Sequence, residues 1–309
     1  MGKGVFFMLL KDLVKEFEFD CKVRELTPKT IGNYQKQLSY FLAFLEDAYG
    51  ITELESLRSV HIKEFINRYQ LRGNKPAYIN DLLKAVKCLC AYAYREGYTE
   101  ELITQRVKNV KEPKVLIHTF SNNEVFAMIN YFSGNDYLSV RNKLITMMLF
   151  DTGIRIAELL DLKPKHIQET YFIIHGKGRK ERVVPKNPMI SKWLFKYMIV
   201  RESYFEDRFA EDYLFLTKNG NKLTNEVVTA RLKEAGRAVG VNPNVRVSPH
   251  TCRHTFAQMQ LRNGLDLYSL SRLMGHESIA ITQRYLDSIQ DFHVLTAAHK
   301  TGVLANLRR

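Results

Sequence analysis

Residues 249–257, PHTCRHTFA, place imidazole and guanidinium groups at helical spacing. Pro249 suits the first position of a helix and Ser248 can cap it, so His250 and Arg253 fall within its first turns. The N-terminus of a helix carries unpaired N–H groups and a partial positive charge, and it therefore binds phosphate well. The segment thus predicts an anion site. The alternative is an ordinary capped helix with His250 on the surface, and this segment alone does not decide.

Two further segments could supply cations to the same anion. In DTGIRIAEL, residues 151–159, Arg155 follows a turn at the start of a helix. Its alternative role is a pair with Glu158, which at this spacing is worth about 0.2–0.5 kcal/mol. In GKGRKERVVP, residues 176–185, Lys177 lies between glycines that allow a sharp hairpin tip. An exposed lysine on such a tip is usually only solvated, so each segment has an explanation without a function.

The last two candidates lie close to the C-terminus. In LMGHESIAIT, residues 273–282, Gly275 ends one helix and His276 stands at the junction to the next. Tyr285 follows nine residues later, but it is one of 16 tyrosines, most of which must serve packing. The set is more informative than its members, because the candidates that could act on one phosphate follow in this order: Arg155, Lys177, His250, Arg253, His276 and Tyr285.

Composition agrees with a polyanionic partner. The chain has 309 residues, 45% of them hydrophobic, which is enough to bury the cores of two domains. Its net charge is +13, divided as +4 up to residue 117 and +9 beyond. Such an excess favours binding to nucleic acid, although a basic protein without any polyanion ligand has the same composition.

The cysteines and the hydropathy of the chain predict in which compartment the protein works. The spacing of the four cysteines fits no zinc template, so we predict reduced thiols, no metal and a cytoplasmic protein; they are Cys21, Cys88, Cys90 and Cys252. The apolar run near the N-terminus is too short for a signal-peptide core, and no segment reaches the length of a membrane span.

The first 108 residues predict a domain of helices only. Thr27 and Pro28 give a helix start, and a later helix extends from about Pro76 to Glu96 before Gly97. Lys84 and Lys87 lie off the apolar face of that later helix. They are candidates for contacts to DNA phosphates, and equally for solvated lysines without a function.

The rest of the chain predicts a linker and a mixed domain. Residues 109–120 show no helical period and read as an extended linker, after which Ser121 and Glu124 form a capping-box pattern. Within residues 121–309 we expect a buried helix at 144–150, short strands at 171–175 and 182–185, and a further candidate strand at 213–217. The predicted fold class is mainly α with a small β-sheet.

These motifs resemble those of the tyrosine recombinases, the family of phage integrases and Xer recombinases. TGIRIAEL is similar to the family's first arginine motif, GKGRKERVVP to its lysine hairpin and HTCRH to its His-x-x-Arg-His box. LMGHESIAITQRYLD is similar to the stretch that ends with the nucleophile; Met274, where leucine is usual, is a conservative difference. The resemblance implies a helical, SAM-like core-binding domain followed by an α+β catalytic domain.

The resemblance also implies a role for each candidate residue. Tyr285 would attack a scissile phosphate to give a 3′-phosphotyrosine, with His250 as its base. Arg155 and Arg253 would bind the phosphoryl oxygens, His276 would donate a further hydrogen bond, and Lys177 would protonate the departing 5′-oxygen. His254 is expected to support His250 by hydrogen bonding or packing. The family needs no cofactor, and no carboxylate cluster in these motifs suggests a metal.

Assembly and biological role are implied only in outline. The expected partners are double-stranded DNA, three further copies of the chain joined through the C-terminal segment 286–309, and an accessory directionality protein. The C-terminal helix could instead pack on its own domain. Integration or excision of a mobile element and Xer-type resolution both fit, because the sequence suggests no arm-binding domain. The alternatives are strand relaxation like that of a type IB topoisomerase and a DNA-binding regulator that has lost catalysis; the six filled positions argue against the regulator.

Overall fold

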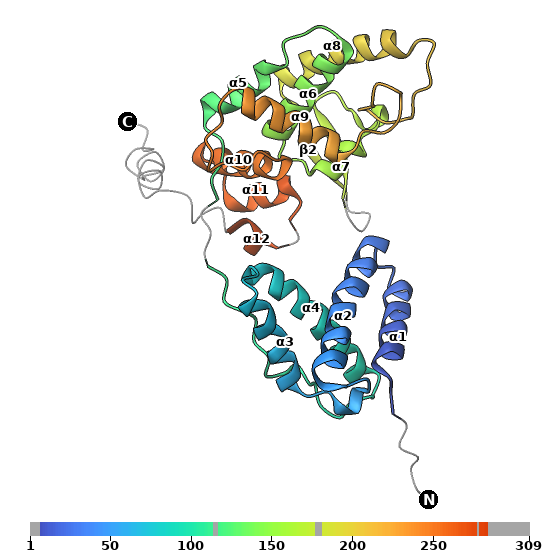
Figure 1. Cartoon of the computed structure of the whole chain (residues 1–309). Helices are drawn as coiled ribbons and strands as arrows, with labels where there is room; N and C mark the ends of the chain where they lie inside the picture. Colours follow the sequence, from blue (N-terminus) through green and yellow to red (C-terminus); the bar gives the residue numbers. More distant parts are fainter. Residues whose placement is uncertain (1–6, 114–116, 177–180, 277, 284–309) are drawn as a thin grey trace, which may run out of the picture. The chain divides into compact units, whose positions relative to one another are not determined.

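The computed structural model describes residues 7–113, 117–176, 181–276 and 278–283. The chain divides into two compact units, residues 1–114 and 115–309 (Figure 1). This division lies inside the segment 109–120 that we read as a linker. We describe each unit separately.

The first unit is a bundle of α-helices with one short 3₁₀ turn (Figure 1). Its elements are α1 (Leu10–Val23), α2 (Pro28–Tyr49), η1 (Leu54–Ser56), α3 (Ser59–Leu71) and α4 (Pro76–Arg95).

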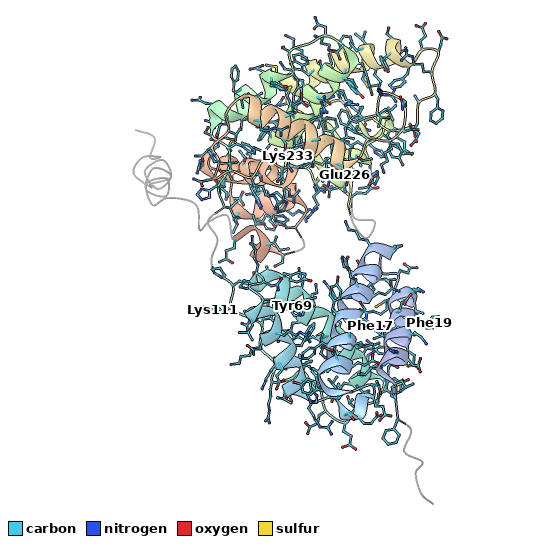
Figure 2. The ribbon with its side chains drawn as sticks, in the orientation of Figure 1. Phe17, Phe19, Tyr69, Lys111, Glu226 and Lys233 are labelled. Carbon is cyan, nitrogen blue, oxygen red and sulfur yellow. The ribbon has the colours of Figure 1, made fainter. Side chains whose placement is uncertain are left out.

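The helices of this unit begin and end where local chemistry directs them. The Thr27 side chain accepts from the Thr30 amide at 3.2 Å, Pro28 occupies the first turn of α2, and Gly50 ends the helix in the left-handed region. Neighbouring side chains then divide between core and solvent: Phe17 is 3% exposed and Phe19 is 68% exposed, both on α1 (Figure 2). The predicted start of α2 and the predicted extent of α4 are therefore confirmed.

Side chains hold the chain at both ends of the linker segment. In the first unit, the Asn80 amide on α4 accepts from the Val110 N–H at 2.8 Å and donates to its carbonyl at 2.9 Å. In the second unit, the Thr119 hydroxyl donates to Gln258 at 2.7 Å, and the Phe120 amide donates to Thr255 at 3.2 Å. Thr255 and Gln258 lie on the helix that starts with PHTCRH, so the second anchor ties the linker segment to that helix.

In its described residues, the second unit has helices and one hairpin as its regular elements (Figure 1). Its described elements are α5 (Asn122–Tyr131), α6 (Tyr137–Asp151), α7 (Ile156–Leu160), η2 (Pro164–His166), β1 (Tyr171–His175), β2 (Glu181–Pro185), α8 (Pro188–Phe205), α9 (Asn225–Ala238), α10 (Pro249–Arg262), α11 (Leu267–Met274) and α12 (Ile279–Gln283). The mainly α class with a small sheet is thus confirmed, as is the capping box of Ser121 and Glu124 at the start of α5.

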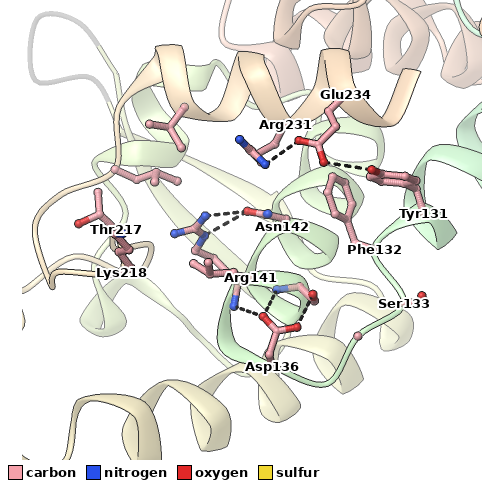
Figure 3. Close-up of a pocket in the computed structure, with 15 residues that line it drawn as sticks. Tyr131, Phe132, Ser133, Asp136, Arg141, Asn142, Thr217, Lys218, Arg231 and Glu234 are labelled. Atoms are coloured by element: carbon pink, nitrogen blue, oxygen red, sulfur yellow. Dashed lines mark hydrogen bonds and ion pairs between the residues drawn. The ribbon is translucent and has the colours of Figure 1, made fainter. Parts of the chain in front are cut away.

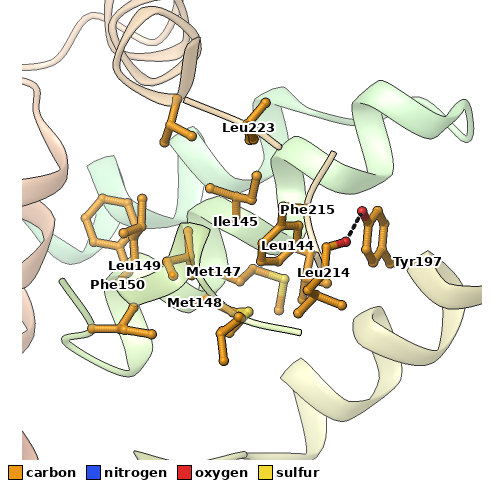
Figure 4. Packing of buried hydrophobic residues seen from close by; sticks show 14 of the residues in the cluster. Leu144, Ile145, Met147, Met148, Leu149, Phe150, Tyr197, Leu214, Phe215 and Leu223 are labelled. Atoms are coloured by element: carbon orange, nitrogen blue, oxygen red, sulfur yellow. Dashed lines mark hydrogen bonds between the residues drawn. The ribbon is translucent and has the colours of Figure 1, made fainter. Parts of the chain in front are cut away.

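Helix α6 forms the centre of this unit's core. Every residue from Leu144 to Phe150 is buried, and α8 and α10 both pack against it (Figure 4). A helix that is apolar on all sides is stable in water only when other elements surround it. The predicted buried helix is therefore confirmed. No helix within the described ranges is both long and apolar enough to span a bilayer.

The two predicted hairpin strands form, but the third strand does not. Strands β1 and β2 pair antiparallel, with Ile174 opposite Arg182. Residues 213–217 contribute only an isolated bridge between Leu216 and Lys222, so that prediction was wrong. Both main-chain groups of Leu214 bond to other parts of the unit. The Leu214 amide donates to the Leu162 carbonyl at 2.6 Å, and the Leu214 carbonyl accepts from the Tyr197 hydroxyl at 2.8 Å (Figure 4).

Candidate active site

The first turns of α10 carry the central candidates. As the sequence predicts, Pro249 begins the helix, and the Ser248 hydroxyl accepts from the Thr251 amide at 3.2 Å. His250 is exposed and its ring contacts that of His254 edge-on, with 4.2 Å between centroids. Arg253, one turn further, is only 4% exposed. The helix therefore presents an accessible imidazole beside a buried guanidinium.

The Arg253 guanidinium connects two turns that are distant in sequence. Its Nη1 donates to the Gly153 carbonyl, and its Nη2 donates to the Met274 carbonyl at 2.7 Å. Its Nη2 also lies 3.0 Å from the His276 ring nitrogen Nε2. Arg253 thus holds the turn before α7 and the turn after α11 against the start of α10.

These contacts orient the ring of His276. A guanidinium has no acceptor, so Nε2 of His276 must accept from Arg253. The proton of a neutral ring is then on Nδ1, which lies 2.7 Å from the buried Thr282 hydroxyl on α12. In this arrangement the His276 ring is oriented from both sides.

Gly153 lets the turn before α7 approach α10 closely. It adopts a φ of +59°, and a Cβ at this position would lie 2.3 Å from the Phe256 ring. A side chain is excluded both by the left-handed backbone and by this close approach. The turn therefore needs glycine for its carbonyl to reach Arg253.

Arg155 is the N-cap residue of α7, and its side chain contacts the turn after α11. Its Nη2 donates to the Gly275 carbonyl at 3.0 Å and its Nη1 to Glu158 Oε1 at 2.9 Å, while its side chain stays 43% exposed. The pair with Glu158, considered above as an alternative to a function, is therefore present. The pair does not occupy the whole guanidinium, because Nη2 also reaches the turn that carries His276.

Glu158 links Arg155 to the hairpin. Both of its oxygens accept from Arg182 on β2, at 2.8 and 2.7 Å. Burial alone would raise the pKa of Glu158, but the hydrogen bonds and charge of Arg182 and the donors of Arg155 outweigh it and hold that pKa below its ordinary value. The carboxylate is therefore charged and bridges two arginines.

Four of the six predicted residues can be placed. Arg155, Arg253 and His276 meet at the turn around Gly275, and His250 lies on the same helix as Arg253. Lys177 and Tyr285 lie outside the described residues. In the other unit, Lys84 is exposed, and Lys87 donates to Asn109 at 2.8 Å; the role of these two lysines in DNA binding remains a prediction.

Sequence reasoning assigned no role to Arg182, Thr282 or the carbonyls of Gly153 and Met274. Arg182 lies within the motif GKGRKERVVP, yet a lone arginine on a strand gives no sign of its partner. The role of a main-chain carbonyl is even less visible, because it depends on the turn rather than on the side chain.

A cavity lies in another part of the second unit. This cavity of about 710 Å³ between α5, α6 and α9 is lined by none of the residues above; Arg141 and Asn142 lie within it, as does the pair of Arg231 and Glu234 (Figure 3). Among the residues that the structure describes, no three His, Cys, Asp or Glu side chains are grouped so that they could hold a metal.

Comparison with known proteins assigns the family. Residues 118–291 match the model of the phage integrase family, and residues 14–97 match the phage integrase N-terminal SAM-like domain. The chain belongs to the phage integrase family. It is accordingly a tyrosine recombinase, an enzyme that breaks and rejoins DNA.

Relatives of this integrase match it over nearly its full length. It is 30% identical to the tyrosine recombinase XerA of Pyrococcus furiosus over 308 residues, 97% of each chain. It is 29% identical to the tyrosine recombinase XerD of Oceanobacillus iheyensis, over 90% of this chain and 94% of that one.

Two solved structures show the same fold. The XerH recombinase in a post-cleavage complex with a palindromic difH substrate superposes with a TM-score of 0.74 at 22% identity, covering 92% of this integrase and 84% of that chain. A lambda integrase tetramer bound to a Holliday junction superposes with a TM-score of 0.71 at 17% identity, covering 91% and 78%.

Proposed function

We propose that the integrase catalyses site-specific exchange of DNA strands through a covalent 3′-phosphotyrosine, with Tyr285 as nucleophile. The observation that supports this most is the convergence of Arg155, Arg253 and His276 on one turn, Met274–His276. Two guanidinium groups and an imidazole from three separate parts of the chain thus lie together, an arrangement suited to one tetrahedral phosphate. Tyr285 follows this turn along the chain.

Each residue has a defined part in the cleavage step. The phenol oxygen of Tyr285 bonds to phosphorus while the bond from phosphorus to the 5′-oxygen breaks. A phenol has a pKa of about 10, so attack at neutral pH needs a base, and the exposed imidazole of His250 takes the proton. Arg155 and Arg253 bind the phosphoryl oxygens, and Lys177 supplies the proton that the 5′-oxygen requires on leaving.

The phosphate must compete with the contacts now present at the site. In the described arrangement the Nη2 of Arg253 donates to the Met274 carbonyl and to His276. A phosphoryl oxygen carries more negative charge than a carbonyl oxygen and makes a stronger bond to a guanidinium. Once the phosphate takes up Arg253, the His276 ring is free to protonate or turn, and it then donates to the phosphate.

The covalent ester retains the energy of the broken bond. Attack of a 5′-hydroxyl on the phosphotyrosine rejoins DNA by the reverse of the first step, so the cycle needs neither ATP nor a metal ion. When the hydroxyl comes from another strand, the product is a recombined strand.

We further propose a tetramer on two DNA sites that passes through a Holliday junction. A lambda integrase of the same fold is a tetramer on such a junction. In this integrase residues 286–309 would join neighbouring copies, a directionality protein would set the outcome, and the reaction would take place in the cytoplasm. Lys84 and Lys87 would contact the DNA backbone.

Covalent capture tests the nucleophile. The integrase is incubated with a library of duplexes that carry random sequence, the reaction is denatured, and DNA bound to protein is sequenced. The recovered site is then rebuilt with a nick beside the cleaved bond, so that the short 5′-hydroxyl strand is lost and the adduct accumulates.

We expect Tyr285→Phe to form no adduct while it still shifts the duplex in a gel. Tyr268→Phe is the matched control, because Tyr268 is an exposed tyrosine on α11, and it should react like the unmodified protein. Adducts from Tyr285→Phe at the normal yield would contradict the assignment. Relaxation of supercoiled DNA by a monomer at random positions would instead support a topoisomerase-like activity.

A further inference from the structure

Arg182 makes an unusual set of contacts for a residue on a two-stranded hairpin. Its two terminal nitrogens donate to the two oxygens of Glu158 at 2.8 and 2.7 Å, and its Nε donates to the Leu273 carbonyl at 2.9 Å. The side chain of Arg182 is 12% exposed and that of Glu158 is 8% exposed. Such a buried, bidentate pair fixes both groups in direction as well as in distance.

The turn after α11 is shaped around the same side chain. Gly275 has a φ of +61°, and a Cβ there would lie 2.9 Å from Cδ of Arg182 and 3.1 Å from its Nε and Nη1. Two main-chain carbonyls of this turn accept hydrogen bonds from arginines. The Leu273 carbonyl accepts from Arg182, and the Gly275 carbonyl accepts from Arg155. Arg182 therefore contacts the turn that presents His276.

These contacts connect the three parts of the site. On one side Arg182 holds Glu158, which accepts from both the main-chain amide and the guanidinium of Arg155 at 2.8 and 2.9 Å. On the other side it holds the end of α11. In addition, β2 directly follows residues 177–180 in the chain, so Arg182 secures the strand that leads out of the segment containing Lys177.

We propose that Arg182 is a positioning residue for DNA cleavage, which orients Arg155 through Glu158 and fixes the turn of His276 through Leu273 and Gly275. The inference rests on the proposed function, because it assumes that Arg155 and His276 act on the scissile phosphate. Arg182 itself does not touch the reacting atoms. Its removal leaves the donors present but misplaced, and a misplacement of about 1 Å can reduce a rate by roughly 100-fold.

The pKa of Glu158 gives this role a distinct signature. Burial raises that pKa and Arg182 is the largest of the influences that lower it. Without Arg182, the pKa of Glu158 rises, so the carboxyl takes up a proton when the pH falls through the new value. A protonated Glu158 no longer attracts Arg155, and the cleavage rate therefore falls on the acidic side.

The experiment measures single-turnover adduct formation on the nicked duplex at saturating DNA, with the full chain. Arg182→Gln removes the charge, and Arg182→Lys keeps it but loses the bidentate pair. We expect Arg182→Gln to lower the rate by roughly 100-fold and Arg182→Lys to restore only a small part of it. The affinity for duplex and the thermal midpoint of the folded protein are measured beside it. Arg231→Gln, which breaks the exposed pair with Glu234, is the matched control and should not change the rate.

The pH profile separates positioning from folding. The unmodified protein loses rate at acidic pH when its base His250 is protonated. We expect Arg182→Gln to add a second acidic decline, from protonation of Glu158, and expect this added decline to vanish in the double variant Arg182→Gln, Glu158→Gln, which has no carboxyl left at that position. If the double variant is no slower than the slower single variant, the two residues act in one pathway. Rates and profiles of Arg182→Gln equal to those of the unmodified protein would overturn the proposal.

Loss of folding and failure of the function give different results. If both Arg182 variants unfold, Glu158→Gln alone still tests the pathway, because it must slow cleavage with unchanged affinity for DNA; an unchanged rate would overturn the proposal. If the unmodified protein forms no adduct on any duplex, the proposed function itself fails. An unmodified protein that cleaves normally while the Arg182 variants do the same refutes only this inference.

Discussion

Among its described residues, the second unit buries two arginines that differ in what surrounds them. Arg141 on α6 is 3% exposed and Arg253 on α10 is 4% exposed, and both donate to main-chain carbonyls. Arg141 donates to its neighbour Asn142 (Figure 3). It also lies over the ring of Tyr137 and donates to the carbonyl of Leu216. Burial lowers its pKa. Through the Leu216 carbonyl, Arg141 binds the irregular segment 213–217 to the core helix α6.

Arg253 contacts main-chain groups of two turns that also carry other polar side chains. Arg155 follows Gly153 by two residues, and His276 follows Met274 by two. Arg155 is partly exposed and His276 half-buried, so an anion from solvent can approach the cluster. The comparison shows that a buried guanidinium does not by itself make a site. Arg253 differs from Arg141 because a second guanidinium and an imidazole, those of Arg155 and His276, lie beside it.

The largest expected effect is on catalysis at Arg253. We expect Arg253→Lys to slow adduct formation by about 10²–10³-fold, equivalent to roughly 2.7–4 kcal/mol, because lysine cannot bind two oxygens in fork geometry. Affinity for duplex should change little, since most of it comes from phosphates outside the cleaved bond. Cleavage at a normal rate would remove Arg253 from the catalytic set.

Arg141 should show the opposite pattern. We expect Arg141→Met to lower the free energy of unfolding by about 1–3 kcal/mol, because the Asn142 oxygen loses its donors and Leu216 loses one of two. The loss is limited because methionine spares the cost of burying a charge. Adduct formation per folded molecule should stay normal. Denaturant titration measures the free energy of unfolding, and the rate of adduct formation divided by the amount of folded protein measures cleavage. Slowed cleavage by the folded variant would show that the two arginines do not differ as we argue.

The same contrast explains what the sequence could predict. Helix starts at Thr27, Ser121 and Ser248 follow from local capping chemistry, which a short window of sequence contains. The order of the catalytic candidates was visible because the motifs carry it. The link from Arg182 to Glu158 was not, because it joins a strand to a helix 24 residues away and depends on the course of the chain between them.

The false strand at residues 213–217 has a related cause. Its run of buried Leu214, Phe215 and Leu216 is typical of a strand, yet nothing in that run shows whether a neighbouring strand is available. In the structure, side chains such as Arg141 and Tyr137 supply the hydrogen bonds that a neighbouring strand would otherwise make.

The smallest expected effect is on stability at Tyr137, which shares an acceptor with Arg141. The Leu216 carbonyl accepts from the Tyr137 hydroxyl at 2.9 Å and from Arg141 Nη1 at 2.6 Å. Tyr137→Phe should therefore cost only about 0.5–1.5 kcal/mol of unfolding free energy and leave cleavage unchanged, because Arg141 still satisfies the carbonyl. Combined with Arg141→Met, however, it leaves a buried acceptor with neither donor, so the loss should exceed the sum of the two single losses. Simple additivity in denaturant titrations would mean that the two donors do not share one acceptor, and that Arg141 stabilises the segment through its other contacts.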